Sequence, residues 1–277
     1  MTGNEYIEEE AARSNSRNTY GTVIKPELRK IYDKFLSDLV ADSYARNKQL
    51  AESMSGNGNG FSREMFIRST KETVLRIEMM RRINPLACVR VAVDDPILCK
   101  QWGLYAADEG LHGRLFAKDL HVLGITEEEL YGTKPLFATE LLAGYLYQTL
   151  ADEGPLGVIA SAYYVETVSG WTQPSWLDGM EAHVGHEATR GARAHLALDE
   201  KEGHIDLAWN MCMRLVKTPE DEERFKQHLV KLHSLFVAYV LEVSQVVAGN
   251  NPDLATLTAA PAAVESSVAA SAIGSRS

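Results

Sequence analysis

Residues 28–40 read LRKIYDKFLSDLV, and their apolar side chains recur at the spacing of an α-helix. The stripe comprises Leu28, Ile31, Tyr32, Phe35, Leu39 and Val40. These positions share one face, so the stretch predicts a helix over 27–53 with one apolar stripe. The glycine- and asparagine-rich run 55–60 then ends it, because such residues favour turns.

The same periodicity continues along most of the chain and decides the fold class. Ser62, Asp95-Pro96 and Thr218-Pro219 are typical starts of helices. No stretch alternates apolar and polar residues over the length of a strand. The sequence therefore predicts an all-α, single-domain bundle of about seven helices, at 27–53, 62–83, 95–123, 135–152, 154–170, 178–216 (interrupted near Gly185) and 219–248.

The two ends differ from this helical body. Residues 1–22 are polar, with three consecutive glutamates at 8–10, and predict an N-terminal arm. Residues 250–277 are rich in alanine and serine and contain no aromatic residue. Such a segment buries too little apolar surface to offset the entropy of ordering it, so we expect a disordered tail. The predicted domain covers 23–249.

Composition excludes several classes of protein. The 277 residues carry 38 acidic and 28 basic side chains, a net charge of −10, whereas a sequence-independent nucleic-acid binder needs a basic face. The cysteines, Cys88, Cys99 and Cys212, form no CxxC pair and are expected as small core residues. No apolar run is long enough for a membrane span, and the N-terminus lacks the features of a signal peptide. We expect a soluble, cytoplasmic protein that binds neither nucleic acid nor membrane.

Two segments place isolated acidic groups on predicted helices. Glu109 and His112 are three residues apart within 95–123, so both side chains are able to point at one ion. The alternative is a solvated carboxylate beside an unrelated histidine. Glu166 interrupts the apolar run VIASAYYVETV at 158–168. A carboxylate there must be paired, protonated or bound to a metal; the alternative to a metal is a structural partner such as arginine or a tyrosine hydroxyl.

A third segment, 194–204, combines histidines and carboxylates. His195 and Asp199 lie one turn apart on a common face. His204 follows Asp199 by five residues and on a regular α-helix would point about 140° away. A π-bulge at Gly203 would bring His204 back to that face. In the competing register Glu202 occupies the face instead, and a third possibility is an exposed, charged turn.

Together these segments supply imidazoles and carboxylates without thiolates. The candidate metal ligands are Glu109, His112, Glu166, His195, Asp199 and His204, with Glu202 as the alternative to His204. Such a donor set favours non-haem iron or manganese over structural zinc. Five or six ligands exceed the needs of one ion and suit two.

The order and spacing of these ligands resemble those of the haem-oxygenase-like di-iron oxidases and oxygenases, which share the helical fold of TenA thiaminase and pyrroloquinoline-quinone synthase. The resemblance covers roughly residues 30–245. Members of the family often carry His-x-x-x-Asp-x-x-His in the last ligand helix. Here Glu202 stands where that pattern has its final histidine, which leaves open whether His204 or Glu202 completes the site.

The resemblance implies an enzyme with two Fe²⁺ ions per chain and O₂ as co-substrate. Its substrate would be an amino-acid-like or fatty-acid-like small molecule, and its reaction N-oxygenation, desaturation or C–C cleavage in a biosynthetic pathway. Arg81, or Arg76 or Arg82, would anchor a substrate carboxylate. The expected pocket walls are Leu111, Val158, Ile159, Tyr163 and Leu198, with Tyr163 also a substrate-binding residue.

Two other hypotheses stay open at this point. One is a metal-free enzyme of the TenA and pyrroloquinoline-quinone synthase type, acting on a vitamin or cofactor precursor. The other is a non-enzymatic helical protein that stores metal or binds a partner. An apolar face on such a domain often meets a second copy of the chain, so a homodimer is possible, and the sequence leaves the oligomeric state open.

Overall fold

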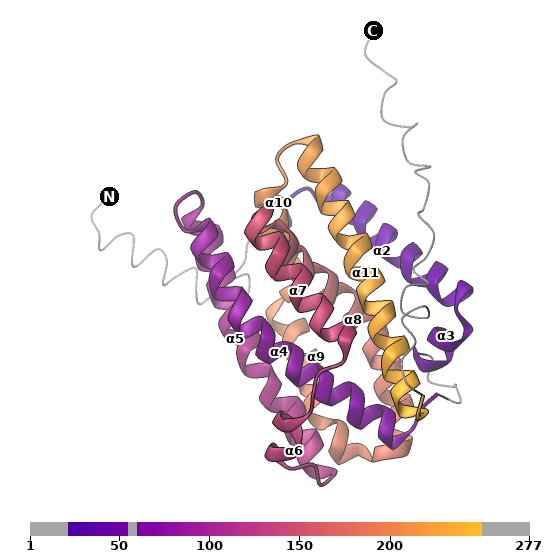
Figure 1. Cartoon of the computed structure of the whole chain (residues 1–277). Helices are drawn as coiled ribbons and strands as arrows, with labels where there is room; N and C mark the ends of the chain where they lie inside the picture. Colours follow the sequence, from indigo (N-terminus) through magenta and orange to yellow (C-terminus); the bar gives the residue numbers. More distant parts are fainter. Residues whose placement is uncertain (1–21, 55–59, 251–277) are drawn as a thin grey trace.

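The computed structural model describes residues 22–54 and 60–250, which form helices and no strand (Figure 1). The predicted all-α class is confirmed. The α-helices are α2 (Pro26–Arg46), α3 (Lys48–Met54), α4 (Arg63–Val91), α5 (Pro96–Val122), α6 (Glu127–Gly132), α7 (Phe137–Asp152), α8 (Leu156–Val184), α9 (Arg190–Glu202), α10 (His204–Leu215) and α11 (Pro219–Val247), with one 3₁₀ helix, η1 (His186–Thr189). All but one residue each of the predicted arm and tail lie outside the described residues.

The described residues contain ten α-helices where seven were expected. The predicted helix 27–53 divides at Asn47, whose backbone is extended and whose side chain accepts the Leu50 N–H at 3.0 Å. The segment 178–216 is interrupted at Gly185 as expected: its first residues belong to the end of α8, and η1, α9 and α10 follow. In the opposite sense, α8 continues through Pro174 and α4 through Pro85. A proline inside a helix removes one backbone hydrogen bond, and packing along both long helices outweighs that loss.

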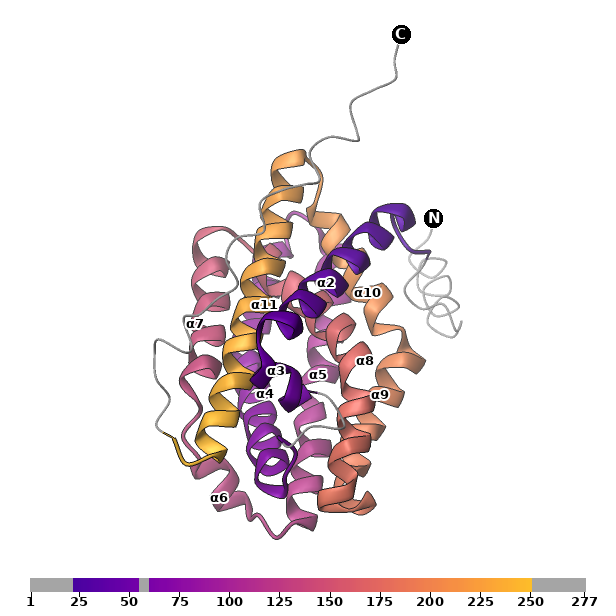
Figure 2. The same ribbon diagram turned by 90° about the vertical axis from the view of Figure 1, so that its right-hand side faces the viewer.

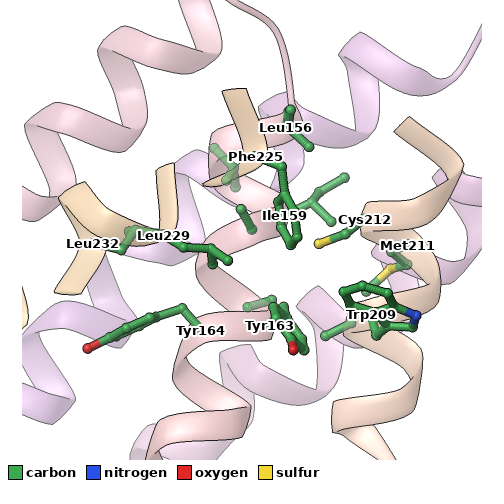
Figure 3. Close-up of a cluster of buried hydrophobic side chains, with 14 of the residues drawn as sticks. Leu156, Ile159, Tyr163, Tyr164, Trp209, Met211, Cys212, Phe225, Leu229 and Leu232 are labelled. Carbon is green, nitrogen blue, oxygen red and sulfur yellow. The ribbon is translucent and has the colours of Figure 1, made fainter. Parts of the chain in front are cut away.

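The long helices α4, α5, α7, α8 and α11 run alongside one another, and α2 and α3 cover one side of α11 (Figures 1 and 2). Helices α9 and α10 pack along α5 and α8. The largest apolar cluster takes side chains from α2, α4, α5, α7, α8, α10 and α11, and Figure 3 shows part of it, with labelled residues of α8, α10 and α11. In it the ring centroids of Tyr163 and Trp209 are 5.2 Å apart, and those of Tyr163 and Phe225 are 5.9 Å apart. Cys212 is buried there as predicted, whereas Cys88 and Cys99 are only partly buried.

Helix α11 is the one described helix that is long and apolar enough to cross a membrane. Its apolar side chains already have protein neighbours, since Phe225, Leu229 and Leu232 belong to the largest core cluster. A core helix of a soluble protein passes the same test of length and composition, and 44% of its most apolar window is buried. Length and composition alone are therefore weak evidence that α11 spans a membrane.

Two buried glutamates from distant helices cap the N-terminus of α7. Its N-cap residue, Leu136, has no side chain able to accept the free backbone N–H groups of the first turn. Glu242 of α11 accepts from Phe137 N at 3.1 Å and Ala138 N at 2.7 Å. Glu72 of α4 accepts from Leu136 N and from the Thr139 hydroxyl. These contacts fix α7 against α4 and α11.

We expect Glu242→Ala to lower the free energy of unfolding by about 2–4 kcal/mol, because it leaves two buried N–H groups without an acceptor. Chemical denaturation measures the change. Glu223→Ala, at an exposed position of the same helix, serves as the control and should change stability by less than about 0.5 kcal/mol. Equal effects of the two substitutions would show that the Glu242 contacts contribute little.

Candidate metal centre

Four helices bring all six predicted ligands into one cluster. Helix α5 carries Glu109 and His112, α8 carries Glu166, α9 carries His195 and Asp199, and α10 begins with His204. The residues form two overlapping groups, Glu109, His112, His195 and Asp199 in one and Glu109, Glu166, Asp199 and His204 in the other. Within each group one donor atom per residue lies within 4.8 Å of all the others. Glu109 and Asp199 belong to both groups, an arrangement able to hold two adjoining metal ions.

The imidazole nitrogens and carboxylate oxygens of the cluster face one another closely. His112 Nδ1 is 3.1 Å from Glu109 Oε1, and His195 Nδ1 is 2.9 Å from Asp199 Oδ2. His204 Nδ1 is 3.1 Å from Asp199 Oδ1 and 3.4 Å from Glu109 Oε1. The side chains are largely removed from solvent, and His204 is completely buried.

Five of these buried atoms have no partner in hydrogen-bonding geometry among the described residues. They are Glu109 Oε1, His112 Nδ1, His195 Nδ1, Asp199 Oδ1 and His204 Nδ1. An unsatisfied buried polar atom costs about 1–3 kcal/mol, so five of them aimed at one place indicate that the cluster is built around a ligand. Three imidazoles with three carboxylates form a donor set that non-haem iron or manganese prefers. The residues present therefore fit a metal centre.

Buried negative charge dominates the electrostatics of the cluster. Burial, together with repulsion from Glu109 and Asp199, raises the pKa of Glu166 to about 8. Burial opposes a charge on His204, but contacts with Asp199 and Glu109 outweigh it and raise the pKa of that imidazole to about 11. Burial likewise opposes a charge on Asp199, yet His195 and His204 lower its pKa to about 2. The three carboxylates thus favour any positive charge placed among them.

A break at Gly203, not a π-bulge, brings His204 to the cluster. Helix α9 ends at Glu202, and Gly203 adopts φ 71° and ψ 38° in the left-handed region that favours glycine. The Gly203 N–H donates to the Asp199 carbonyl at 3.0 Å, which closes the last turn of α9. Helix α10 then starts in a new direction at His204. The prediction of a π-bulge was wrong, but Gly203, the residue expected to tolerate the distortion, is where the helix breaks.

Glu202 and His204, offered by the sequence as alternatives, make different contacts. His204 Nδ1 faces the cluster, whereas its Nε2 lies 3.1 Å from Glu202 Oε2. With the proton on Nε2 donated to Glu202, the lone pair of Nδ1 faces Glu109 and Asp199 of the cluster. A carboxylate that holds the second nitrogen of a ligating histidine fixes its tautomer and its orientation. The Glu202 side chain itself is 39% exposed.

One solved structure has the same architecture. A domain of unknown function from Shewanella denitrificans, described as having a heme oxygenase-like fold, superposes with a TM-score of 0.68 over 87% of this chain and 100% of that one. The chain has a haem-oxygenase-like fold. The two sequences are 20% identical, so the likeness concerns the fold alone. No protein-family model and no curated protein matches the chain.

Within this haem-oxygenase-like bundle, Asp119 and Gly191 set the position of the ligand helix α9. The Asp119 carboxylate on α5 accepts from Gly191 N at 2.7 Å and Ala192 N at 2.8 Å, and so caps α9. The backbones approach so closely that a Cβ on Gly191 would lie 2.1 Å from the Leu115 carbonyl oxygen. One turn later, the His195 ring lies 4.5 Å from that of His112. Neither Asp119 nor Gly191 was predicted from the sequence to position α9, because the two residues that contact each other are some 70 positions apart.

An apolar cavity of about 210 Å³ lies against the cluster, between α4, α5, α7, α8 and α11. Glu109, Glu166 and His195 form part of its wall. The Tyr105 hydroxyl, also on the wall, donates to Glu166 Oε1 at 2.8 Å and orients that carboxylate. The cavity thus gives a small apolar molecule direct access to the candidate ligands.

Two of the arginines proposed for substrate binding line this cavity. Arg81 does so while pairing with Glu78 at 2.8 Å. Arg76 lies with its guanidinium 5.7 Å from the centre of the Tyr239 ring, and it makes no ion pair within 22–54 and 60–250. Arg82 does not line the cavity and is exposed.

The expected pocket walls need correction. Tyr163 is fully buried in the core of Figure 3, where its hydroxyl donates to Asp33 at 2.6 Å, and Tyr164 lines the cavity in its place. Successive helical residues point about 100° apart, so only one of the two tyrosines is able to face the cavity. Leu111 is 52% exposed and points to solvent. The other expected wall residues, Val158, Ile159 and Leu198, do not line the cavity either.

We predict that His204→Ala lowers the number of metal ions that the protein binds, because it deletes a ligand of the second group. Glu202→Ala should leave that number unchanged and weaken affinity by about 10–100-fold, as expected for a residue that orients a ligand. Glu202→Gln, whose amide oxygen still accepts from Nε2, is the conservative control. Metal titration of the three variants tests the assignment. Full loading of His204→Ala with loss of an ion in Glu202→Ala would make Glu202 the ligand.

We also predict that Gly191→Ala lowers stability by about 1–3 kcal/mol and weakens metal binding, because the new methyl group forces α9 away from α5. The control is Gly144→Ala on α7, where an added Cβ meets no atom within 4 Å. That substitution should stabilise the protein by about 0.5–1 kcal/mol through helix propensity. Thermal unfolding measures the change in stability, and metal titration measures the change in affinity. If Gly191→Ala matched wild type in both, the close contact between Gly191 and Leu115 would not be what positions α9.

Proposed function

We propose that the protein is a non-haem di-iron enzyme that uses O₂ to oxidise a small organic substrate. The observation that supports this most directly is the pair of four-residue donor groups that share Glu109 and Asp199 beside an apolar cavity. His112 and His195 would complete one ion's ligands, and Glu166 and His204 those of the other. Two Fe²⁺ ions per chain would supply the electrons for reaction with O₂.

The chain's own part is to hold ligands, exclude water and orient the substrate. Tyr105 fixes Glu166 by donating to one oxygen, which limits the geometries that this carboxylate adopts. Phe116, Leu142 and Trp176 are among the apolar side chains that keep the cavity dry. A dry site protects a strong oxidant from reaction with water.

The cavity supports an organic acid as the substrate class. Its apolar walls suit a hydrocarbon chain, and Arg76 and Arg81 offer guanidinium groups that bind carboxylates. An amino-acid-like or fatty-acid-like molecule has both features. N-oxygenation, desaturation and C–C cleavage are the reactions proposed for such a substrate at this site.

The alternatives explain less of the site. A metal-free hydrolase of the TenA type relies on a cysteine nucleophile, and none of Cys88, Cys99 and Cys212 lines the described cavity. It would also leave five unpartnered donor atoms in one buried place without a role. A non-enzymatic metal store has no use for an apolar cavity with two arginines.

The deciding experiment is anaerobic Fe²⁺ titration, followed by exposure to O₂ with optical detection. Wild-type protein should bind close to two irons per chain, and His112→Ala and His195→Ala should each lower that number because each removes a ligand. His186→Ala, at an exposed histidine outside the cluster, is the matched control and should bind as wild type does. Absence of iron binding, or of any O₂-dependent absorbance change in the loaded protein, would refute the proposal.

A further inference from the structure

A second cavity, of about 340 Å³, reaches the same cluster between α8, α9 and α10. Glu166 and Asp199 belong both to the candidate metal centre and to the wall of this cavity. Glu166 also borders the apolar cavity described above, so the two cavities meet at this carboxylate. The metal centre therefore has a second approach, which the proposed substrate does not need.

The charged side chains on the two cavity walls differ. The charged side chains lining the second cavity, within the described chain, are all carboxylates: Glu166, Asp199 and Glu200. The wall of the apolar cavity includes Arg76 and Arg81 as well as Glu109 and Glu166. A divalent cation is therefore attracted more strongly along the second cavity, whose charged side chains are all acidic, while the arginines of the apolar cavity oppose its entry there.

We propose that the second cavity is the route by which divalent metal ions reach the cluster, leaving the apolar cavity to the substrate. The proposal rests on the di-iron function proposed above. Glu200 is exposed and able to attract a cation from solvent. Asp199 is 8% exposed, and its Oδ1 has no partner in hydrogen-bonding geometry among residues 22–54 and 60–250, so a ligand atom is available where the route ends.

The width of the route depends on Gly170 of α8 and Ile205 of α10, which face each other in its wall. A Cβ built on Gly170 would lie 3.7 Å from Ile205 Cδ1, an ordinary contact distance. Alanine therefore fits at position 170 without displacing its neighbour, whereas a larger side chain extends into the cavity. Alanine and a larger residue at position 170 therefore narrow the route to different degrees, and neither substitution changes a proposed ligand.

The test measures the rate at which metal-free, full-length protein takes up Co²⁺, whose visible absorption changes on binding histidine and carboxylate ligands. We expect Gly170→Leu to slow uptake about tenfold or more and to reach the wild-type end point, while Gly170→Ala stays near the wild-type rate. Glu200→Gln should slow uptake about two- to threefold at low ionic strength and weaken its salt dependence. Glu223→Gln makes the same change in net charge away from either cavity and should behave as wild type does.

The outcomes separate this inference from the function on which it rests. Wild-type protein that takes up no Co²⁺ or Fe²⁺ would overturn the metal centre and the route together. Normal binding by wild type, with wild-type uptake rates in both Gly170→Leu and Glu200→Gln, would overturn the route alone. Far-ultraviolet circular dichroism checks the fold of Gly170→Leu. If that variant is unfolded, the comparison of Glu200→Gln with Glu223→Gln decides.

Discussion

The mutual repulsion of three buried carboxylates is the constraint around which this bundle is arranged. Two unit charges 4 Å apart interact by about 4 kcal/mol at the effective dielectric constant of a protein, while a whole domain is stable by only about 5–15 kcal/mol. Glu109, Glu166 and Asp199 therefore need compensating positive charge. A proton on Glu166 and another on His204 supply part of it, as the raised pKa values of both groups reflect. Two divalent cations would supply more, and would also satisfy the donor atoms that protons leave unpartnered.

Other buried carboxylates in the same fold show what a structural role looks like. Glu242 and Asp119 each accept two backbone N–H groups at the start of a helix, and Glu72 accepts from a backbone N–H, a hydroxyl and Arg68. Their negative charge meets the positive end of a helix or a guanidinium group. Glu109 and Asp199 have no backbone donor, and each keeps one oxygen without a partner among the described residues. The contrast between complete and incomplete hydrogen bonding distinguishes capping carboxylates from candidate ligands far better than burial does.

The sequence predicts those features that depend on neighbours within a few turns. The stripe at 28–40, the pair Glu109 and His112, and the pair His195 and Asp199 are local patterns, and each lies on a helix as expected. The helix caps formed by Asp119 and Glu242 were not predictable from local sequence patterns, because they join residues about 70 to 105 positions apart. Tyr163 was misplaced for a different reason. Helix α8 is buried on all sides from Leu156 to Tyr164, so it has no polar face from which to deduce which tyrosine meets the cavity.

The proposed access from two sides would resolve a conflict inherent in a metal enzyme that acts on an acid. An arginine that attracts the substrate also repels the metal, and a carboxylate that attracts the metal also repels the substrate. With separate cavities, Arg76 and Arg81 would act mainly on the substrate and Glu200 mainly on the metal. Glu166 lines both cavities. Tyr105, on the wall of the apolar cavity, donates a hydrogen bond to its carboxylate. The burial of Glu166 among apolar residues of α8, which first marked it in the sequence, accompanies this position on the walls of both cavities.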